Sequence, residues 1–234
     1  MPKPSAAAAP AAKFTAWSFS RLNDYRKCPK YAFYKHLRKI SEGAESDALA
    51  RGSHVHELAQ VFSQQSSKKK CPPELATFEE EFRVLQKNRA TLAVERQMAV
   101  NRQWEPCDWF ARDAWLRVII DASFRHEPLA MTVIDYKTGK IREEHEEQVD
   151  LFCLVALCTH QDLEAAKAEL WYVDHGVLKP DAAKVFTRKD IPALKKKWEG
   201  NSRAMLADGT FREKPGKACT WCAYSKGKGG PCKY

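Results

Sequence analysis

Apolar side chains recur at helical spacing in the first part of the chain. Between residues 19 and 40 they follow one helical stripe: Leu22, Tyr25, Phe33 and Leu37. This 3.6-residue period predicts a helix, for which Ser20 is a suitable N-cap and within which Pro29 marks a break or a fresh start. The same period predicts two further helices, over residues 48–62 and 73–88.

Further along the chain, the helical period gives way to alternating apolar and polar residues and to runs of β-branched residues. They predict strands over residues 94–100, 115–124, 131–136 and 168–173, and a short edge strand over 177–186. Two more helices are predicted, over residues 144–158 and 191–206. The connection 123–130, which contains Pro128, is expected to be a hairpin turn. Because three strands precede a helix and another strand, the pattern predicts an α/β fold with a central mixed β-sheet flanked by helices.

Two of the predicted strands carry acidic residues near their ends. Asp135 and Lys137 are two positions apart, so on a strand their side chains point to one face, and Asp121 closes the preceding apolar run. Two carboxylates and an ammonium on neighbouring strands are suited to binding a divalent cation and activating water against a phosphodiester. The Asp-x-Lys pattern alone is weak evidence, because an aspartate at a strand end is commonly a turn residue.

Charge and composition narrow the class of protein. The 234-residue chain has a formal net charge of +9, with lysine runs at 68–70 and 195–197. This excess indicates a polyanionic partner, although a single lysine run is commonly a solvated helix face. Residues 1–13 are rich in alanine and proline and are expected to be disordered. No stretch resembles a signal peptide or reaches membrane-spanning length, so a cytosolic location is expected.

The chain has eight cysteines, and without a recognisable secretory signal these favour metal ligation or burial over disulfides. Cys153 and Cys158 fall in the apolar pattern of the 144–158 helix, and we expect them to be small core residues. Cys71 and Cys107 lie beside prolines in expected loops and receive no role. The remaining four, one early in the chain and three near its end, favour a bound metal: Cys28, Cys219, Cys222 and Cys232.

Several motifs along the chain match one known family. They are the Ser18–Pro29 opening, Gly52-x-x-x-His56, Asp121, Asp135-Tyr136-Lys137 and the helical stretch Gln148–Phe152. In order and content, residues 19–234 resemble the PD-(D/E)XK nuclease superfamily and, within it, the RecB-like branch, which includes helicase-associated nuclease domains, phage exonucleases and CRISPR adaptation nucleases. Val118-Ile119-Ile120 departs from the Gly-Arg-Ile of that branch, and Phe152 replaces a tyrosine. Altered DNA contacts are expected there, with the carboxylate retained.

The resemblance implies a restriction-endonuclease-like core within one domain. Residues 1–13 would be the tail and 14–234 the domain. Its predicted parts are an N-terminal helical part (14–90), a catalytic sheet core (91–187) and a C-terminal helix with the cysteine segment (188–234).

The resemblance also implies roles for individual residues. The implied cation ligands are His56, Asp121, Asp135 and the backbone carbonyl of Tyr136. The implied catalytic residues are Asp121, Asp135, Lys137 and Gln148. An oxygen-rich set of ligands with one imidazole suits Mg²⁺ or Mn²⁺. His54 competes with His56, which the spacing from Gly52 favours, while Glu57 and Glu95 are expected to support the ligands or to be ordinary surface acids.

For the cysteines, the resemblance implies a [4Fe-4S] cluster that joins the N- and C-terminal segments. Its implied ligands are Cys28, Cys219, Cys222 and Cys232. Structural zinc is the alternative, because a Cys-x-x-Cys knuckle with two further cysteines makes a tetrahedral site. Such zinc sites usually pair two knuckles, whereas this chain has one, which favours the iron-sulfur cluster.

The implied function is divalent-metal-dependent hydrolysis of DNA. We expect a single-strand or end-directed exonuclease of recombination, repair or phage DNA processing, in a bacterial or phage-infected host cytosol, with no membrane contact. A recombination or helicase partner is left open. The alternatives are a catalytically inactive or partner-dependent DNA-binding module and a CRISPR-type adaptation nuclease. The complete set of acids, lysine and histidine argues against the inactive module.

Overall fold

The computed structural model describes residues 13–44 and 46–234. The predicted disordered tail, residues 1–13, lies outside the described residues except for Lys13. The chain divides into two compact units. Unit 1 comprises Met1–Gly43 and Gly200–Tyr234, and unit 2 comprises Ala44–Glu199. The assignment of residues 14–234 to one domain stays a prediction.

Unit 2 contains a six-stranded sheet with the strand order β2-β1-β3-β4-β5-β6. The strands are β1 (Ala93–Val100), β2 (Pro106–Cys107), β3 (Leu116–Glu127), β4 (Ala130–Lys137), β5 (Ala165–Tyr172) and β6 (Val177–Thr187). β4 and β5 pair in parallel and the other neighbours pair antiparallel. The sheet is therefore mixed. β6 lies at its edge, as predicted, but its 11 residues make it longer than the short strand that was expected.

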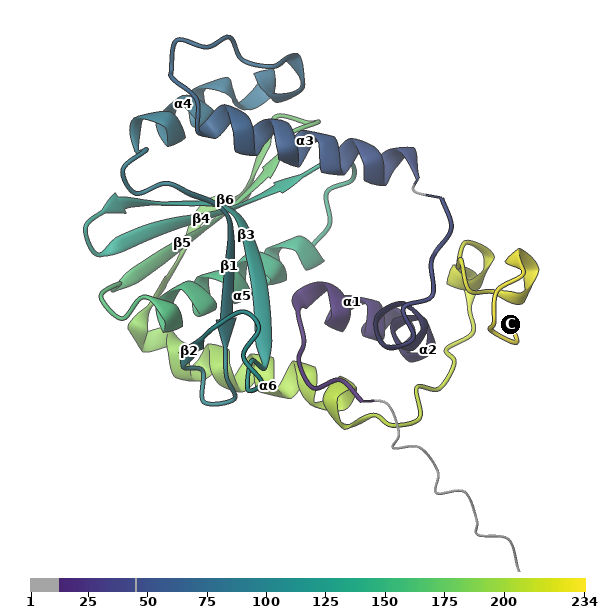
Figure 1. Ribbon diagram of the computed structural model, residues 1–234. Helices are drawn as coiled ribbons and strands as arrows, with labels where there is room; N and C mark the ends of the chain where they lie inside the picture. The colour runs from purple at the N-terminus through teal and green to yellow at the C-terminus, as the bar shows by residue number, and fades with distance from the viewer. Residues whose placement is uncertain (1–12, 45) are drawn as a thin grey trace, which may run out of the picture. The chain divides into compact units, whose positions relative to one another are not determined.

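Helices cover both faces of this sheet. They are α3 (Asp47–Ser63), α4 (Glu79–Lys87), α5 (Glu144–Thr159) and α6 (Ile191–Ala207), of which α6 continues into unit 1. α3 and α4 lie on one face and α5 on the other (Figure 1). The predicted α/β architecture of a mixed sheet flanked by helices is confirmed. No helix in the described parts of the chain is long and apolar enough to cross a membrane.

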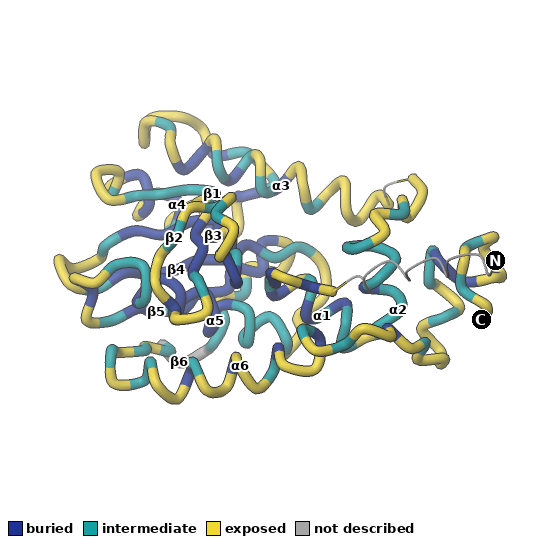
Figure 2. Tube along the Cα trace, turned by 60° about the horizontal axis from the view of Figure 1, so that its bottom comes forward, coloured by how far each residue is buried: buried dark blue, intermediate teal, exposed yellow. Residues whose placement is uncertain are grey.

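An aromatic core holds α3 and α4 on the sheet. Phe78 stacks on Trp171 with ring centroids 5.3 Å apart, and Phe82 meets the same indole edge-on at 5.2 Å. Val55 and Phe62 of α3 are buried in this cluster. Burying one such side chain contributes about 1.5–3 kcal/mol. α3 is therefore fixed against the strands, whose buried stretches are dark blue in Figure 2.

α5 is buried on all sides over most of its length. Every residue from Val149 to Leu157 is buried, as expected for a helix enclosed by protein. Cys153 is fully buried, which confirms it as a small core residue, whereas Cys158 is only partly buried. Gln148 precedes this buried run and lies at its edge.

Three local predictions differ from the structure. β3 extends to Glu127, so the hairpin turn is shorter than residues 123–130, because His126 and Thr132 bond across the ladder at 2.9 Å. The helix predicted over 73–88 is divided into a 3₁₀ segment, Pro73–Phe78, and α4. The two-residue strand β2 was not predicted.

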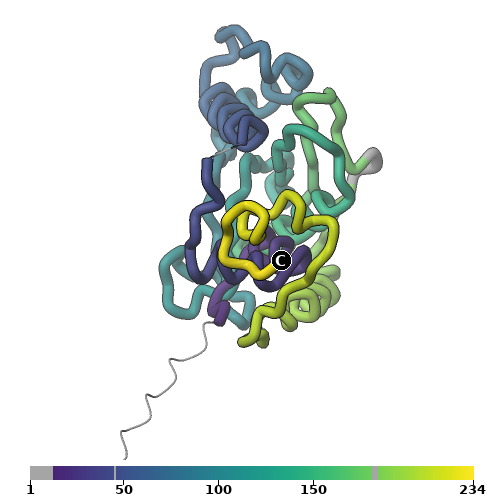
Figure 3. The backbone as a smooth tube through the Cα atoms, turned by 90° about the vertical axis from the view of Figure 1, so that its right-hand side faces the viewer, coloured from purple at the N-terminus to yellow at the C-terminus, as the bar shows by residue number. Residues whose placement is uncertain are grey.

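Unit 1 is built from both ends of the described chain. It contains α1 (Phe19–Lys27), α2 (Pro29–Ala32), a π-helical turn (Phe33–Leu37) and two short 3₁₀ turns (Lys217–Thr220 and Lys226–Lys228). The helix breaks at Cys28, as Pro29 predicts, but the N-cap is Ser18 rather than Ser20, since the Ser18 hydroxyl accepts from the Arg21 amide. The C-terminal segment lies beside the π-helical turn, where Tyr34 donates to the Pro231 carbonyl (Figure 3).

A buried carboxylate, Asp24, anchors the helical part of unit 1. It lies 2.9 Å from the imidazole Nε2 of His36 and 3.4 Å from the ammonium of Lys35. Burial alone would raise the pKa of Asp24, but the His36 hydrogen bond and the neighbouring lysine charges outweigh it and hold the pKa below its usual value. The stability that this carboxylate contributes is therefore present above its unfolded pKa and is lost as the pH falls through its folded pKa.

We expect Asp24→Asn to lower the free energy of unfolding by about 1–3 kcal/mol at pH 7. The difference from the wild type should shrink as the pH falls through the folded pKa of Asp24 and disappear below it, where the carboxyl group is protonated in both states. Urea unfolding at several pH values measures this effect. Asp113→Asn, which changes an exposed carboxylate in unit 2, is the control. An Asp24→Asn loss that does not depend on pH would contradict the electrostatic explanation.

Candidate metal and catalytic site

The register of the sheet brings three carboxylates into one row. Val94 pairs with Ala122 and Arg96 with Ile120, so Glu95 on β1 lies opposite Asp121 on β3. On the other side of β3, Ala122 pairs with Ile134, and the next position along β4 is Asp135. Neighbouring strands lie only about 4.8 Å apart. The three acids consequently occupy adjacent strands at one level of the sheet.

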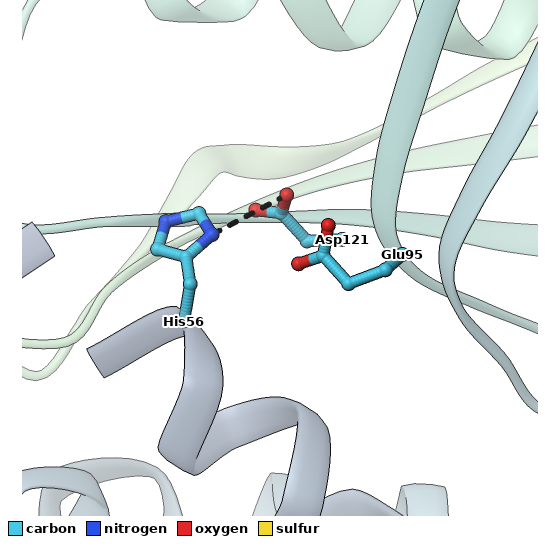
Figure 4. A group of neighbouring side chains, drawn as sticks. All are labelled: His56, Glu95 and Asp121. Carbon is cyan, nitrogen blue, oxygen red and sulfur yellow. Dashed lines mark ion pairs between the residues drawn. The ribbon is translucent and has the colours of Figure 1, made fainter. Parts of the chain in front are cut away.

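α3 adds an imidazole to this row. His56 Nδ1 lies 3.5 Å from Asp121 Oδ1, and His56 Nε2 lies 3.1 Å from the Tyr136 carbonyl oxygen. The ligand atoms of His56, Glu95 and Asp121 all lie within 4.8 Å of one another, and Figure 4 shows the imidazole directed at the two carboxylates. His54 is exposed on the same helix, so the structure places His56 rather than His54 in the group.

Glu95 enters the group through an unusual backbone conformation. Its φ is 48°, in the left-handed region that non-glycine residues seldom adopt, although it lies within a strand. This conformation costs about 1–2 kcal/mol. Strain of this kind persists where the surrounding structure fixes it, and it is concentrated at functional sites. Sequence reasoning considered Glu95 only as a supporting or surface acid, and the cross-strand register with Asp121 is the signal that identifies it.

A second group of side chains lies beside the first. Lys137 Nζ is 2.5 Å from Asp135 Oδ2 and donates to Gln148 Oε1 at 3.0 Å. The amide of Gln148 donates in turn to Asp135 Oδ1 at 3.0 Å. The end of β4 and the first turns of α5 therefore hold the acid, the lysine and the glutamine in one closed network. Asp135 is engaged in this network and is not among the three residues grouped around His56.

The charges of the site explain its pKa shifts. Burial raises the pKa of Asp135 to about 6, and the ammonium of Lys137 only partly offsets that shift. Burial would lower the pKa of Lys137, but the Asp135 carboxylate outweighs it and raises the pKa, so the lysine stays charged. Burial raises the pKa of Glu95, and the negative charge of Asp121 adds to this shift. His56 has a raised pKa because Asp121 outweighs the effect of its burial.

The donor set fits a divalent cation. Carboxylate oxygens with one imidazole are ligands that suit Mg²⁺ and Mn²⁺. A bound cation would relieve the repulsion between Glu95 and Asp121, which raises the pKa of Glu95 here. The Tyr136 amide, which donates to Asp121 Oδ2 at 2.6 Å, already fixes the orientation of that carboxylate. The residues present therefore suit a divalent metal ion.

Comparison with known families agrees with this geometry. The sequence model of the PD-(D/E)XK nuclease superfamily matches residues 16–226, which is most of the chain. The chain belongs to the PD-(D/E)XK nuclease superfamily. This nuclease family implies a nucleic-acid substrate and makes a divalent metal plausible at the acidic site.

Other comparisons add little to the nuclease assignment. No curated protein matches the chain. Among solved structures, the crystal structure of SSO0001 is similar at 16% sequence identity, over 94% of this chain and 87% of that chain, with a TM-score of 0.41. That similarity is too weak to carry a functional inference.

The loop that follows Lys137 is held by the turn between β5 and β6. Asp174 Oδ2 accepts from the Gly139 amide at 2.9 Å and also pairs with Arg51 of α3. The imidazole of His175 contacts the Gly139 carbonyl at 2.7 Å. Asp174 thus connects α3, which carries His56, with the segment that carries Lys137, and we expect it to position these side chains.

We expect Asp174→Ala to lower kcat for nucleic-acid cleavage about 10-fold, because small displacements of catalytic groups are costly. KM should change little, and Asp174→Asn should retain more activity, since its amide oxygen still accepts from Gly139. Steady-state kinetics on a labelled oligonucleotide measure kcat and KM separately for each variant. The control is Asp108→Asn, which alters an exposed acid outside this loop. Equal loss of kcat in Asp174→Ala and Asp108→Asn would contradict the positioning role.

Four cysteines of the nuclease line one pocket in unit 1. The pocket has a volume of about 390 Å³, and its cysteines are Cys28, Cys219, Cys222 and Cys232. Burial raises the pKa of Cys222, and the other three cysteines add to the shift, which agrees with their being neighbours. Among the described residues, no three cysteine sulfurs lie within 4.8 Å of one another, so the thiols form no compact cage.

Proposed function

We propose that this protein is a divalent-metal-dependent deoxyribonuclease, more specifically a single-strand or end-directed exonuclease of the RecB-like branch. The observation that supports it best is the Asp135–Lys137–Gln148 network, which lies beside the His56–Glu95–Asp121 group on neighbouring strands. A lysine that is half-buried, charged and directed at a carboxylate is suited to a site where negative charge develops. Recombination, repair or phage DNA processing is the corresponding biological setting, with a helicase or recombination protein as a possible partner class.

We assign the cation to His56, Asp121, Asp135 and the Tyr136 carbonyl, with Glu95 as an additional carboxylate. When bound, a divalent cation supplies Lewis-acid polarisation of the phosphate and lowers the pKa of water. Lys137 would stabilise the charge that accumulates on the phosphate oxygens, since its ammonium is retained despite burial. Gln148 would hold the Lys137 ammonium and the Asp135 carboxylate at their mutual distance through its two hydrogen bonds.

The test is incubation of the purified protein with end-labelled single- and double-stranded DNA in Mg²⁺ or Mn²⁺. Linear single-stranded DNA should be degraded from an end, whereas covalently closed single-stranded circles should stay intact. Cleavage of circles would overturn the exonuclease assignment and leave the nuclease assignment in place. Metal-dependent binding without cleavage of any substrate would favour the inactive DNA-binding module instead. Cleavage that appears only with an integration partner would favour the CRISPR-type adaptation nuclease.

We further propose that the four pocket cysteines hold a [4Fe-4S] cluster. Four thiolates satisfy such a cluster. The pocket that all four cysteines line supports a four-thiolate centre, and zinc is the alternative.

Cys28→Ser is expected to remove most of the bound iron and sulfide, because Cys28 is the one pocket cysteine contributed by the N-terminal segment. Iron, sulfide and zinc analysis after anaerobic purification, together with the visible absorption spectrum, measures the loss. Cys107→Ser, which changes a partly buried cysteine of unit 2, should retain the wild-type content. A colourless wild-type protein with one stoichiometric zinc would replace the cluster with the zinc alternative.

A further inference from the structure

The net positive charge of this chain comes from one of its two units. In sequence, unit 1 contains 16 lysines and arginines and 4 aspartates and glutamates, which gives a formal charge of +12. Unit 2 contains 23 lysines and arginines and 26 aspartates and glutamates, which gives a formal charge of −3. The candidate metal and catalytic residues all belong to unit 2. A polyanion is therefore attracted to unit 1, while the acidic row of unit 2 repels it until a cation binds.

Within unit 1, a large aromatic side chain faces the solvent. Trp221, between Cys219 and Cys222, is 74% exposed, and Tyr234 is 47% exposed. Both residues line the cysteine pocket. A tryptophan side chain buries about 150–250 Å² when it is covered. An exposed indole presents a flat face on which another ring can stack.

Three lysines contact these two residues, two of them through the backbone carbonyls and one through a ring. Lys228 Nζ donates to the Trp221 carbonyl at 3.4 Å, and the Lys226 amide donates to the Tyr234 carbonyl at 2.6 Å. The ammonium of Lys233 lies 5.2 Å from the centre of the Tyr234 ring. Exposed rings on a segment that also carries lysines provide surfaces for bases together with charges for phosphates.

The surface around Trp221 is fixed from beneath. Tyr224 is buried and its hydroxyl donates to the Ile40 carbonyl at 2.8 Å. The rings of Tyr31 and Tyr34 pack against Tyr224 at 5.3 and 5.5 Å. An ordered platform loses little conformational freedom when a ligand binds, which favours affinity.

We propose that Trp221, with Lys226 and Lys228, forms a binding surface for single-stranded DNA, on which a base stacks against the indole. Duplex DNA keeps its base faces covered by neighbouring pairs, whereas an unpaired strand presents them, and every base offers a face for stacking. The choice of DNA rests on the proposed deoxyribonuclease function. The stacking surface itself rests on the exposed ring and the charge of unit 1.

The test is fluorescence anisotropy of a fluorescein-labelled dT20 oligonucleotide in EDTA, where no metal-dependent cleavage takes place. Trp221→Ala should weaken binding about 5- to 150-fold, as for the loss of one stacked base, while Trp221→Phe should stay within a few-fold of the wild type. Phe110→Ala is the matched control, because Phe110 is 88% exposed but belongs to unit 2. Metal content and urea unfolding verify that each variant retains its fold.

Salt dependence tests the lysines. Substituting both Lys226 and Lys228 by glutamine should reduce the slope of log K against log salt by about 1.4, at about 0.7 per phosphate contact of a single strand. Binding by Trp221→Ala within twofold of the wild type, or an unchanged slope in the double variant, would overturn the proposal. Tighter binding of an rU20 probe that also depends on Trp221 would overturn DNA as the ligand.

The binding test and the cleavage test have independent outcomes, so one proposal can be refuted while the other stands. Trp221-dependent binding of dT20 by a protein that cleaves no DNA would sustain the stacking surface and refute the deoxyribonuclease. Cleavage that depends on Lys137, with dT20 binding insensitive to Trp221, would refute the stacking surface and sustain the deoxyribonuclease.

Discussion

Replacing Lys137 by alanine should lower kcat for DNA cleavage at least about 1,000-fold, in both Mg²⁺ and Mn²⁺. Removing one preorganised group that stabilises transition-state charge typically costs about 100- to 1,000-fold. Here the same change also leaves the buried carboxylate of Asp135 without its ion pair. Asp135→Asn should cause a loss of similar size, because it removes the carboxylate that faces the lysine. Single-turnover assays with end-labelled DNA measure the chemical step directly.

Lys140→Ala is the matched control for this experiment, because Lys140 lies three residues further along the same loop and is exposed. It should retain near-normal cleavage. Lys137→Met keeps most of the buried aliphatic volume, so its loss of activity separates the role of the charge from a packing defect. Metal-dependent cleavage retained by both Lys137→Ala and Asp135→Asn would contradict the assignment of the site.

Gly230→Ala should disorganise the cysteine segment. A β-carbon at Gly230 would lie far inside van der Waals contact of the Tyr224 backbone, and backbone atoms cannot move aside as a flexible side chain does. The Gly230 amide donates to the Ser225 carbonyl at 2.9 Å, and the Cys232 amide donates to the Tyr224 carbonyl at 2.9 Å. Opening this close approach would break both bonds and displace Cys232, at a cost of roughly 3 kcal/mol or more.

Limited proteolysis and metal analysis measure that effect. Gly230→Ala should be cut rapidly within residues 219–234 and should lose most of its metal. Gly227→Ala is the control, since a β-carbon there has nothing within 4 Å, and it should match the wild type. Equal resistance and equal metal content in the two variants would show that the Tyr224 backbone tolerates a side chain at Gly230.

The two-residue alternation of side chains along the strands made much of the fold predictable. Alternating and β-branched runs define β3, β4 and β5 because the side chains of these strands are sorted between two faces. The pairing of Asp135 with Lys137 follows from the same two-residue period. Gln148 was predictable as a neighbour only through the family resemblance, because the hydrogen bonds to both residues depend on how α5 packs.

Other features depend on interactions that a local pattern does not encode. Glu95 reaches His56 and Asp121 through the pairing of β1 with β3 and a left-handed φ at a non-glycine residue. β2 has only two residues, too few for any period. The proximity of Cys28 to the C-terminal cysteines was implied by the resemblance, and no spacing within the chain requires it.

The composition of unit 1 has a consequence for folding during synthesis. Its N-terminal part ends at Gly43 and its C-terminal part begins at Gly200, so all of unit 2 is translated between them. Unit 2 is continuous in sequence and has its own aromatic core, so it can fold while the ribosome is still adding residues. The Cys28 thiol must meanwhile wait for Cys219, Cys222 and Cys232 to emerge. Over that interval the early thiol is open to oxidation or to binding of another metal, so the order of synthesis would be a hazard for assembly of the proposed four-cysteine centre.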